Sequence, residues 1–127
     1  MEPKNKQALA VSLKHGGYNC CQAVLCAFAD ETDLPRESLL ALGAGFGVGM
    51  GTMEATCGAL IAAELLLGLK RYAGKPLLRD AAALHRAFEA RCGAVICKDL
   101  KGAANGAPVC PCDDCVRAAA ALAEELQ

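Results

Sequence analysis

The chain has 127 residues, of which 54 % are hydrophobic and 4 % aromatic, and its formal net charge is -1 at pH 7. This length suits one domain with a hydrophobic core, so we expect residues 1–127 to form a single unit. Without a basic excess to neutralise phosphates, the chain is not expected to bind nucleic acid. Glu64 interrupts the longest apolar stretch, and the N-terminus lacks the order of a secretory signal, so we expect a cytoplasmic protein without a membrane span.

The first part of the chain is predicted to form three short helices. Residues 5–14 carry clustered apolar side chains and are followed by two glycines, which commonly end a helix. Asn19 is a good N-cap for a second helix at 20–29, and Cys20 falls in its first turn. A third helix is expected at 36–42, with Pro35 early in it.

A glycine-rich loop, residues 43–51 (GAGFGVGMG), precedes an apolar central helix at 55–69, and Cys57 lies where this helix begins. Several backbone N–H groups lack partners at a helix start, and the helix dipole is positive there. A thiolate is stabilised in that place, so its pKa falls from about 8.5 to between about 3.5 and 7.5. Cys57 is therefore a candidate nucleophile or metal ligand.

Three further helical segments are predicted after the central helix. They are a helix at 77–91, a short turn or helix at 97–100 that begins with Cys97, and a last helix at 112–127 with Cys115 near its start. An irregular connection rich in Gly, Asn and Pro is expected at 101–111. Because no stretch alternates apolar and polar residues, we predict an all-α bundle of about five to six helices, with the glycine-rich loop before the central helix.

Cysteine is the residue type on which the functional interpretation depends. A reducing compartment disfavours structural disulfides, and an odd number of thiols cannot all be paired, so redox or metal chemistry is the better explanation. Cysteine occurs at nine positions: Cys20, Cys21, Cys26, Cys57, Cys92, Cys97, Cys110, Cys112 and Cys115. Helix starts are predicted at or near Cys20, Cys57 and Cys115, and also at Cys97.

Several stretches occur together in an order and at a spacing that resemble a known family. They are residues 19–24 (NCCQAV), 45–51 (GFGVGMG), 56–59 (TCGA), 66–70 (LLGLK) and 97–100 (CKDL), followed by the late Cys115. The chain resembles the small four-cysteine proteins named for the CGCAxxGCC motif and described as redox-active. One departure is Ala62, where the motif closes with glycine. The resemblance implies that the functional set is Cys20, Cys57, Cys97 and Cys115.

These four thiols are compatible with different kinds of site. They can ligate an iron–sulfur cluster, since soft sulfur donors select iron or zinc over hard cations. A pair of them can instead cycle between dithiol and disulfide without a cofactor. Either site would exchange electrons with a redox partner that the sequence does not identify, and no enzymatic reaction is specified. The alternatives are a zinc-binding structural or interaction module, and a helical scaffold with buried, unliganded thiols.

The glycine-rich loop and the CxxC pair each have two interpretations. The loop lacks the G-x-G-x-x-G order and the preceding strand of a nucleotide site. It is a connector, or else a cradle of backbone N–H groups over the cofactor, formed by Gly47, Gly49, Gly51 and Gly58. Cys112-x-x-Cys115 is a thioredoxin-type pair outside a βαβ context. Cys110 and Cys112 are thus spare thiols, auxiliary ligands or a resolving partner.

The remaining candidates are expected to have structural roles. Core packing is the interpretation for Cys21, Cys26 and Cys92. Neither histidine is in a nucleophile or zinc motif, and Glu64 is expected to be solvated or paired with a nearby Lys or Arg. Small residues on the central helix favour close packing against another helix or a homodimer seam: Gly58, Ala59, Ala62 and Ala63.

Overall fold

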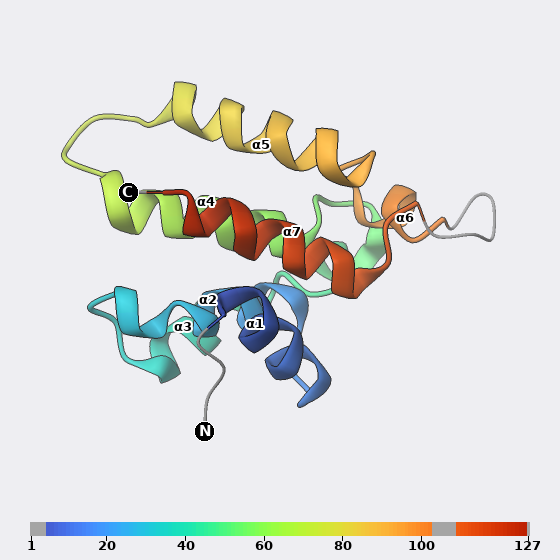
Figure 1. Cartoon of the computed structure of the whole chain (residues 1–127), viewed down its shortest axis with the longest axis horizontal. Coiled ribbons are helices and arrows are strands. Elements are labelled where there is room, and N and C mark those ends of the chain that lie inside the picture. Colours follow the sequence, from blue (N-terminus) through green and yellow to red (C-terminus); the bar gives the residue numbers. More distant parts are fainter. Residues whose placement is uncertain (1–4, 103–108, 127) are drawn as a thin grey trace.

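The computed structural model describes residues 5–102 and 109–126. These residues are organised as helices joined by short connections (Figure 1). The α-helices are α1 (Lys6–His15), α2 (Cys20–Ala27), α3 (Arg36–Gly43), α4 (Gly58–Arg71), α5 (Leu78–Cys92), α6 (Cys97–Leu100) and α7 (Cys112–Glu124). A 3₁₀ turn, η1 (Ala29–Glu31), follows α2, and a wide turn, η2 (Gly49–Met53), precedes α4. The prediction of an all-α fold is confirmed: no strand occurs within the described ranges.

Local sequence signals explain most helix boundaries. The Asn19 side chain accepts a hydrogen bond of 2.8 Å from the Gln22 backbone N–H, and the Gln22 side chain accepts one of 3.1 Å from the Asn19 N–H. This reciprocal capping box fixes the start of α2. Gly93 ends α5 in a left-handed conformation, with φ of 88°. Pro35 was expected early in the third helix; it is the N-cap of α3 and lies directly before the first helical residue, Arg36.

The core is built around α2, which packs against α1, α3, α4 and α7. In Figure 1, α4 and α7 run side by side, and α5 covers their other side. Ala59, Ala62 and Ala63 of α4 are completely buried. Their small side chains let α4 approach α2 and α7 closely, which confirms the expectation of close helix packing. The core thereby forms from Leu, Ala and Cys with few aromatic rings.

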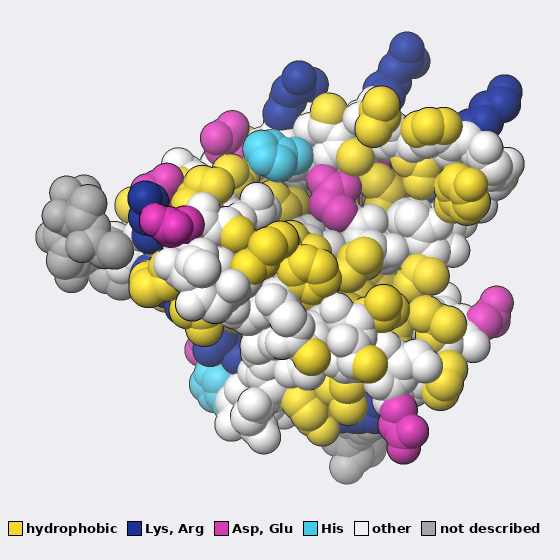
Figure 2. Space-filling view, turned by 180° about the vertical axis from the view of Figure 1, so that it is seen from behind, with side chains coloured by type: hydrophobic (Ala, Val, Ile, Leu, Met, Phe, Trp, Pro, Cys, Tyr) yellow, Lys and Arg dark blue, Asp and Glu magenta, His cyan; other side chains and the backbone are white. Residues whose placement is uncertain are grey.

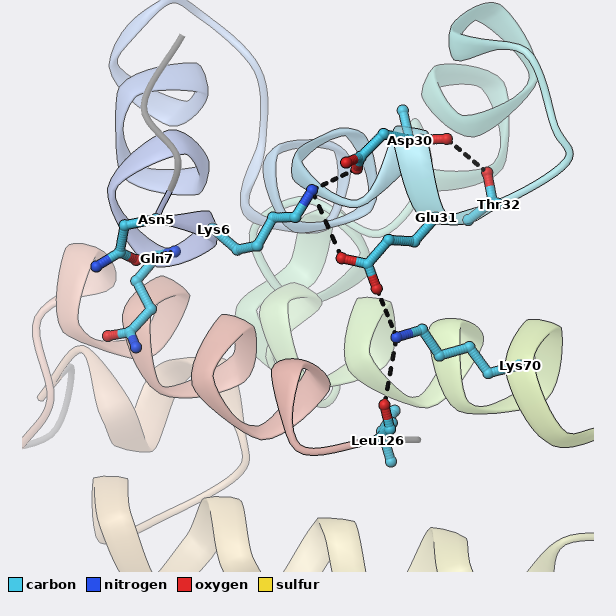
Figure 3. A network of polar contacts seen from close by, with 9 residues as sticks. Asn5, Lys6, Gln7, Asp30, Glu31, Thr32, Lys70 and Leu126 are labelled. Carbon is cyan, nitrogen blue, oxygen red and sulfur yellow. Dashed lines mark hydrogen bonds and ion pairs between the residues drawn. The ribbon is translucent and has the colours of Figure 1, made fainter.

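A network of polar contacts joins the start of α1, η1 and the last turn of α4 (Figure 3). The Lys6 ammonium contacts Asp30 and Glu31, and the Lys70 ammonium donates a hydrogen bond of 2.7 Å to the other oxygen of Glu31. Both ammonium groups lie over the Phe28 ring, 5.5 and 5.7 Å from its centroid. These contacts tie α1, η1 and α4 together, although pairs near the surface contribute little individually.

Two sequence expectations concern stretches that are only partly described. Residues 103–108 of the predicted irregular connection and Gln127 of the predicted last helix lie outside the described residues. The described helix α7 ends at Glu124. None of the described helices is long and apolar enough to cross a membrane.

Candidate functional site

Six cysteines line one cavity at the end of the bundle where the glycine-rich loop lies. The cavity encloses about 330 Å³, including the part open to solvent. Its cysteines are Cys20, Cys57, Cys97, Cys110, Cys112 and Cys115. The structure therefore brings together the four cysteines predicted from the sequence and adds two. What these thiols bind or do stays a prediction.

Each predicted cysteine reaches the cavity from the beginning of a different helix. Cys20 and Cys97 are the first residues of α2 and α6, and Cys57 is the N-cap of α4. Cys115 lies in the first turn of α7. Because the helices converge at one end, residues far apart in the sequence become neighbours.

A backbone bridge holds Cys57 and Cys97 beside each other. Thr56 and Ile96 form an isolated antiparallel bridge. Within it, the Cys57 N–H donates to the Val95 carbonyl at 2.7 Å, and the Cys97 N–H donates to the Ala55 carbonyl at 2.9 Å. The bridge fixes the backbone of both cysteines, so the positions of their thiols depend little on the loops that follow.

The environment of Cys57 favours its thiolate. A hydrogen bond from the Cys115 thiol is the main cause, and the backbone N–H groups of Ala59 and Leu60 at the start of α4 add to it. Burial opposes these effects, and the pKa of Cys57 settles at about 7. The neighbouring Cys57 sulfur, together with burial, raises the pKa of Cys115, whose thiol donates a hydrogen bond of 3.5 Å to the Cys110 carbonyl oxygen. Helix-start stabilisation of Cys57 agrees with the sequence-based expectation.

Cys20 and Cys112 form a second thiol pair with the same division of roles. The Cys20 thiol donates a hydrogen bond to the Cys112 sulfur, which lowers the pKa of Cys112 to about 6 and raises that of Cys20. The charges of Lys101 and Lys14 lower the pKa of Cys112 further. Both cysteines are partly exposed, whereas Cys57 and Cys115 are buried. The second pair is therefore the more exposed of the two.

Three buried thiols, two of which line the cavity, form a close group. The sulfur atoms of Cys92, Cys110 and Cys115 are all within 4.8 Å of one another. Cys92 is the last residue of α5, and the packing of α5 against α7 brings it to this place. Cys92 was expected only to pack in the core; it is buried, but its sulfur also belongs to this group of possible metal ligands.

Lys101 supplies positive charge to the cavity. It directly follows α6 and lines the cavity beside the cysteines. Burial disfavours its charged form, but nearby thiolates outweigh burial and raise its pKa, with Cys112 and Cys97 contributing most. No sequence motif pointed to Lys101, since its role depends on how α6 is placed against the other helices.

Two of the four glycines predicted to cradle a cofactor line the cavity, namely Gly49 and Gly58. A Cβ on Gly49, which has a φ of +57°, would lie 2.7 Å from the Cys97 Cβ. One on Gly58 would lie 2.5 Å from the Phe46 carbonyl oxygen. Both positions therefore require glycine. Gly47 instead packs against Asn19, and Gly51 is not among the described residues around the cavity.

Three other residues differ in how they match their expected roles. Cys21 and Cys26 are buried outside the cavity lining, as expected for core residues, and burial raises the pKa of both thiols. Glu64 was expected to be solvated or paired with Lys or Arg; it is half-buried, and no ion pair of Glu64 occurs among the described residues. Its Oε1 atom is buried and has no hydrogen-bond partner in the described structure.

Comparison with known proteins identifies one family. No curated protein and no solved structure matches the chain. The family described as "Putative redox-active protein (C_GCAxxG_C_C)" matches residues 18–126, a range that contains every cysteine of the cavity. The chain thus belongs to this family, the C_GCAxxG_C_C family.

Proposed function

We propose that this protein exchanges electrons with a disulfide-bearing partner through a reversible disulfide between Cys20 and Cys112. The observation that carries the proposal is that Cys20 and Cys112 line one cavity and are both partly exposed, while the Cys20 thiol lowers the pKa of Cys112. The Cys112 sulfur is stabilised as the attacking thiolate, and the Cys20 thiol stays protonated until the mixed disulfide forms. Membership of a redox-active family agrees with such chemistry.

The exchange balances without a bound cofactor. The Cys112 thiolate attacks one sulfur of the partner disulfide, forming a mixed disulfide and releasing the other partner sulfur as a thiolate. Cys20 then loses its proton and attacks the Cys112 sulfur of the mixed disulfide, which releases the second partner thiolate. The protein is oxidised from dithiol to disulfide, and the partner disulfide is reduced to two thiols after two protons are taken up.

The buried pair is suited to a supporting role. In this pair the pKa of Cys57 is lowered, which favours its thiolate, and the pKa of Cys115 is raised, which keeps its thiol protonated. Both cysteines are buried. A partner disulfide would therefore meet Cys112 first. The charge of the Cys57 thiolate also raises the pKa of Cys20, which keeps the resolving thiol protonated until the mixed disulfide forms.

Metal binding is the second candidate function, and the group Cys92, Cys110 and Cys115 favours it. Three sulfur donors within 4.8 Å suit a soft ion such as zinc, and thiolate ligation would be expected to release their protons. An iron–sulfur cluster on Cys20, Cys57, Cys97 and Cys115 is the other form of this proposal, since these four thiols share one cavity.

Anaerobic purification followed by metal analysis and thiol counting separates these functions. For the disulfide function we expect colourless, metal-free protein that loses two thiols in oxidised glutathione, with Cys20 joined to Cys112 in the peptide map. Cys112→Ser should abolish this disulfide, while the matched variant Cys26→Ser, outside the cavity, should keep it. Brown protein containing iron and sulfide would replace the proposal with the cluster, and stoichiometric zinc would replace it with the zinc module.

A further inference from the structure

A second hollow lies on the other side of the segment that leads into α4. It encloses about 740 Å³, including the part open to solvent, between η2, α4 and α5. Its walls include the apolar side chains of Phe46, Met50, Leu60 and Ile61, together with Glu64 and His85. We call it the Glu64 cleft. Figure 2 shows the face opposite to that of Figure 1, where acidic and histidine side chains border a broad hydrophobic area.

The Glu64 cleft is distinct from the cysteine cavity, although one segment forms a wall of both. Phe46, Met50 and Thr56 line the cleft, whereas Val48 and Gly49 line the cysteine cavity. No cysteine is among the described residues that line the cleft. A ligand in the cleft would therefore be recognised by apolar contacts and by the two titratable groups, without contact to a thiol.

The carboxyl group of Glu64 is the polar feature of this cleft that needs an explanation. Its Oε1 atom is buried, and no hydrogen bond satisfies it within the described residues. Burial raises the pKa of Glu64 to about 7. A buried polar group without a partner destabilises a fold, so most such groups in proteins are paired. An unpaired carboxyl at the wall of an apolar hollow is a feature of ligand sites.

We propose that the Glu64 cleft binds a small molecule with an apolar body and a protonated amine, and that Glu64 is the counter-ion of that amine. A cation supplies both missing partners of the carboxylate, a positive charge and hydrogen-bond donors, in surroundings where Coulomb attraction is screened less than in water. The apolar body covers Phe46, Leu60 and Ile61, which gains hydrophobic free energy. His85 offers a second polar contact at the wall of the cleft.

A set of three probes of equal length tests the proposal: hexylamine, hexanol and hexanoate. Binding is followed by NMR through the methyl groups of Leu60, Ile61 and Leu65, at pH 7.5. We expect hexylamine to bind about tenfold more tightly than hexanol, and hexanoate to bind most weakly. Equal affinity for the amine and the alcohol, or no shift of these methyl groups with any probe, would overturn the proposal.

Two variants of equal charge locate the amine. Glu64→Gln should remove the preference for hexylamine and leave hexanol binding in place, because the apolar walls are unchanged. Glu54→Gln removes the same charge from a nearby exposed position and should keep the preference. An amine preference that survives Glu64→Gln would show that Glu64 is not the counter-ion. These measurements do not involve the cysteines, so their outcome is independent of the proposed disulfide chemistry.

Discussion

Cys20, the first residue of α2, and Cys112, the first residue of α7, line the same cavity, where the Cys20 thiol lowers the pKa of Cys112 by hydrogen bonding to its sulfur. This contact is the largest cause of the low pKa of Cys112, about 6. It joins two helix starts that are far apart in the sequence. The contact makes Cys112 the accessible thiol with the greatest thiolate fraction at neutral pH.

We predict that Cys112 is alkylated faster than the other cysteines between pH 6 and 8. Its rate should rise with pH and reach half of its maximum near pH 6, because the thiolate is the reacting form. Iodoacetamide labelling of the reduced protein, resolved by cysteine in mass spectrometry, measures this. In Cys20→Ala the midpoint should move to higher pH, since the hydrogen-bond donor is lost. Labelling of Cys21 as fast as that of Cys112 would contradict the assignment.

Replacement of Lys101 by methionine should also raise the pKa of Cys112. The Lys101 ammonium stabilises the Cys112 thiolate, and methionine keeps most of the side-chain length without the charge. The alkylation midpoint of Cys112 should therefore move to higher pH, and labelling at pH 6 should slow. Lys98→Met is the matched control, because Lys98 is an exposed lysine of α6, the helix that Lys101 directly follows. Equal midpoints in the two variants would show that Lys101 does not act on Cys112.

The contact between Gly49 and Cys97 predicts a cost for any side chain at position 49. Gly49→Ala places a Cβ 2.7 Å from the Cys97 Cβ at a φ of +57°, so both the overlap and the backbone are unfavourable. We expect the free energy of unfolding to fall by about 1–3 kcal/mol. Urea denaturation under reducing conditions measures it.

Gly68→Ala is the matched control for this substitution. Gly68 lies within α4, and a Cβ there would meet nothing within 4 Å. Alanine should therefore stabilise the protein by about 0.5–1 kcal/mol through its helix propensity. If Gly49→Ala were as stable as the natural protein, or more stable, the loop would accept a Cβ at position 49 without strain.

Features set by neighbouring residues were predictable from the sequence. The all-α class and most helix boundaries follow from apolar periodicity and from caps such as Asn19 and Gly93. The placement of Cys20, Cys57 and Cys97 at helix starts has the same local origin. From that placement a shared cysteine site could be anticipated, since the starts of several helices can converge on one place.

Features set by tertiary packing were not predictable in this way. Cys92 joins Cys110 and Cys115 because α5 packs against α7, and no local pattern contains that contact. The CxxC spacing did mark Cys112, but nothing in the sequence paired it with Cys20 rather than with Cys115. The burial of the Glu64 Oε1 atom was not predictable for the same reason, since whether a helix residue meets solvent or a covering element depends on the fold.

The last prediction concerns Glu64 and the stability of the protein at different pH values. Burial raises the pKa of this carboxyl from 4.5 to about 7, so the folded state binds more protons than the unfolded state between these values. The stability contribution of Glu64 is therefore greatest below pH 4.5 and falls as the pH rises toward 7. The full shift corresponds to about 3 kcal/mol, and solvent screening of this partly exposed group reduces it to about 1–2 kcal/mol.

Glu64→Gln should remove this dependence, because the amide does not titrate. We expect the variant and the natural protein to have similar free energies of unfolding at pH 4, and the variant to be more stable by about 1–2 kcal/mol at pH 8. Urea denaturation at pH 4, 5.5 and 8 under reducing conditions measures the difference, with Glu54→Gln as the control for an exposed glutamate. A difference that does not grow with pH would mean that Glu64 is solvated in the folded protein. The unpaired carboxylate would then be absent, and with it the physical reason for the cleft to prefer an amine.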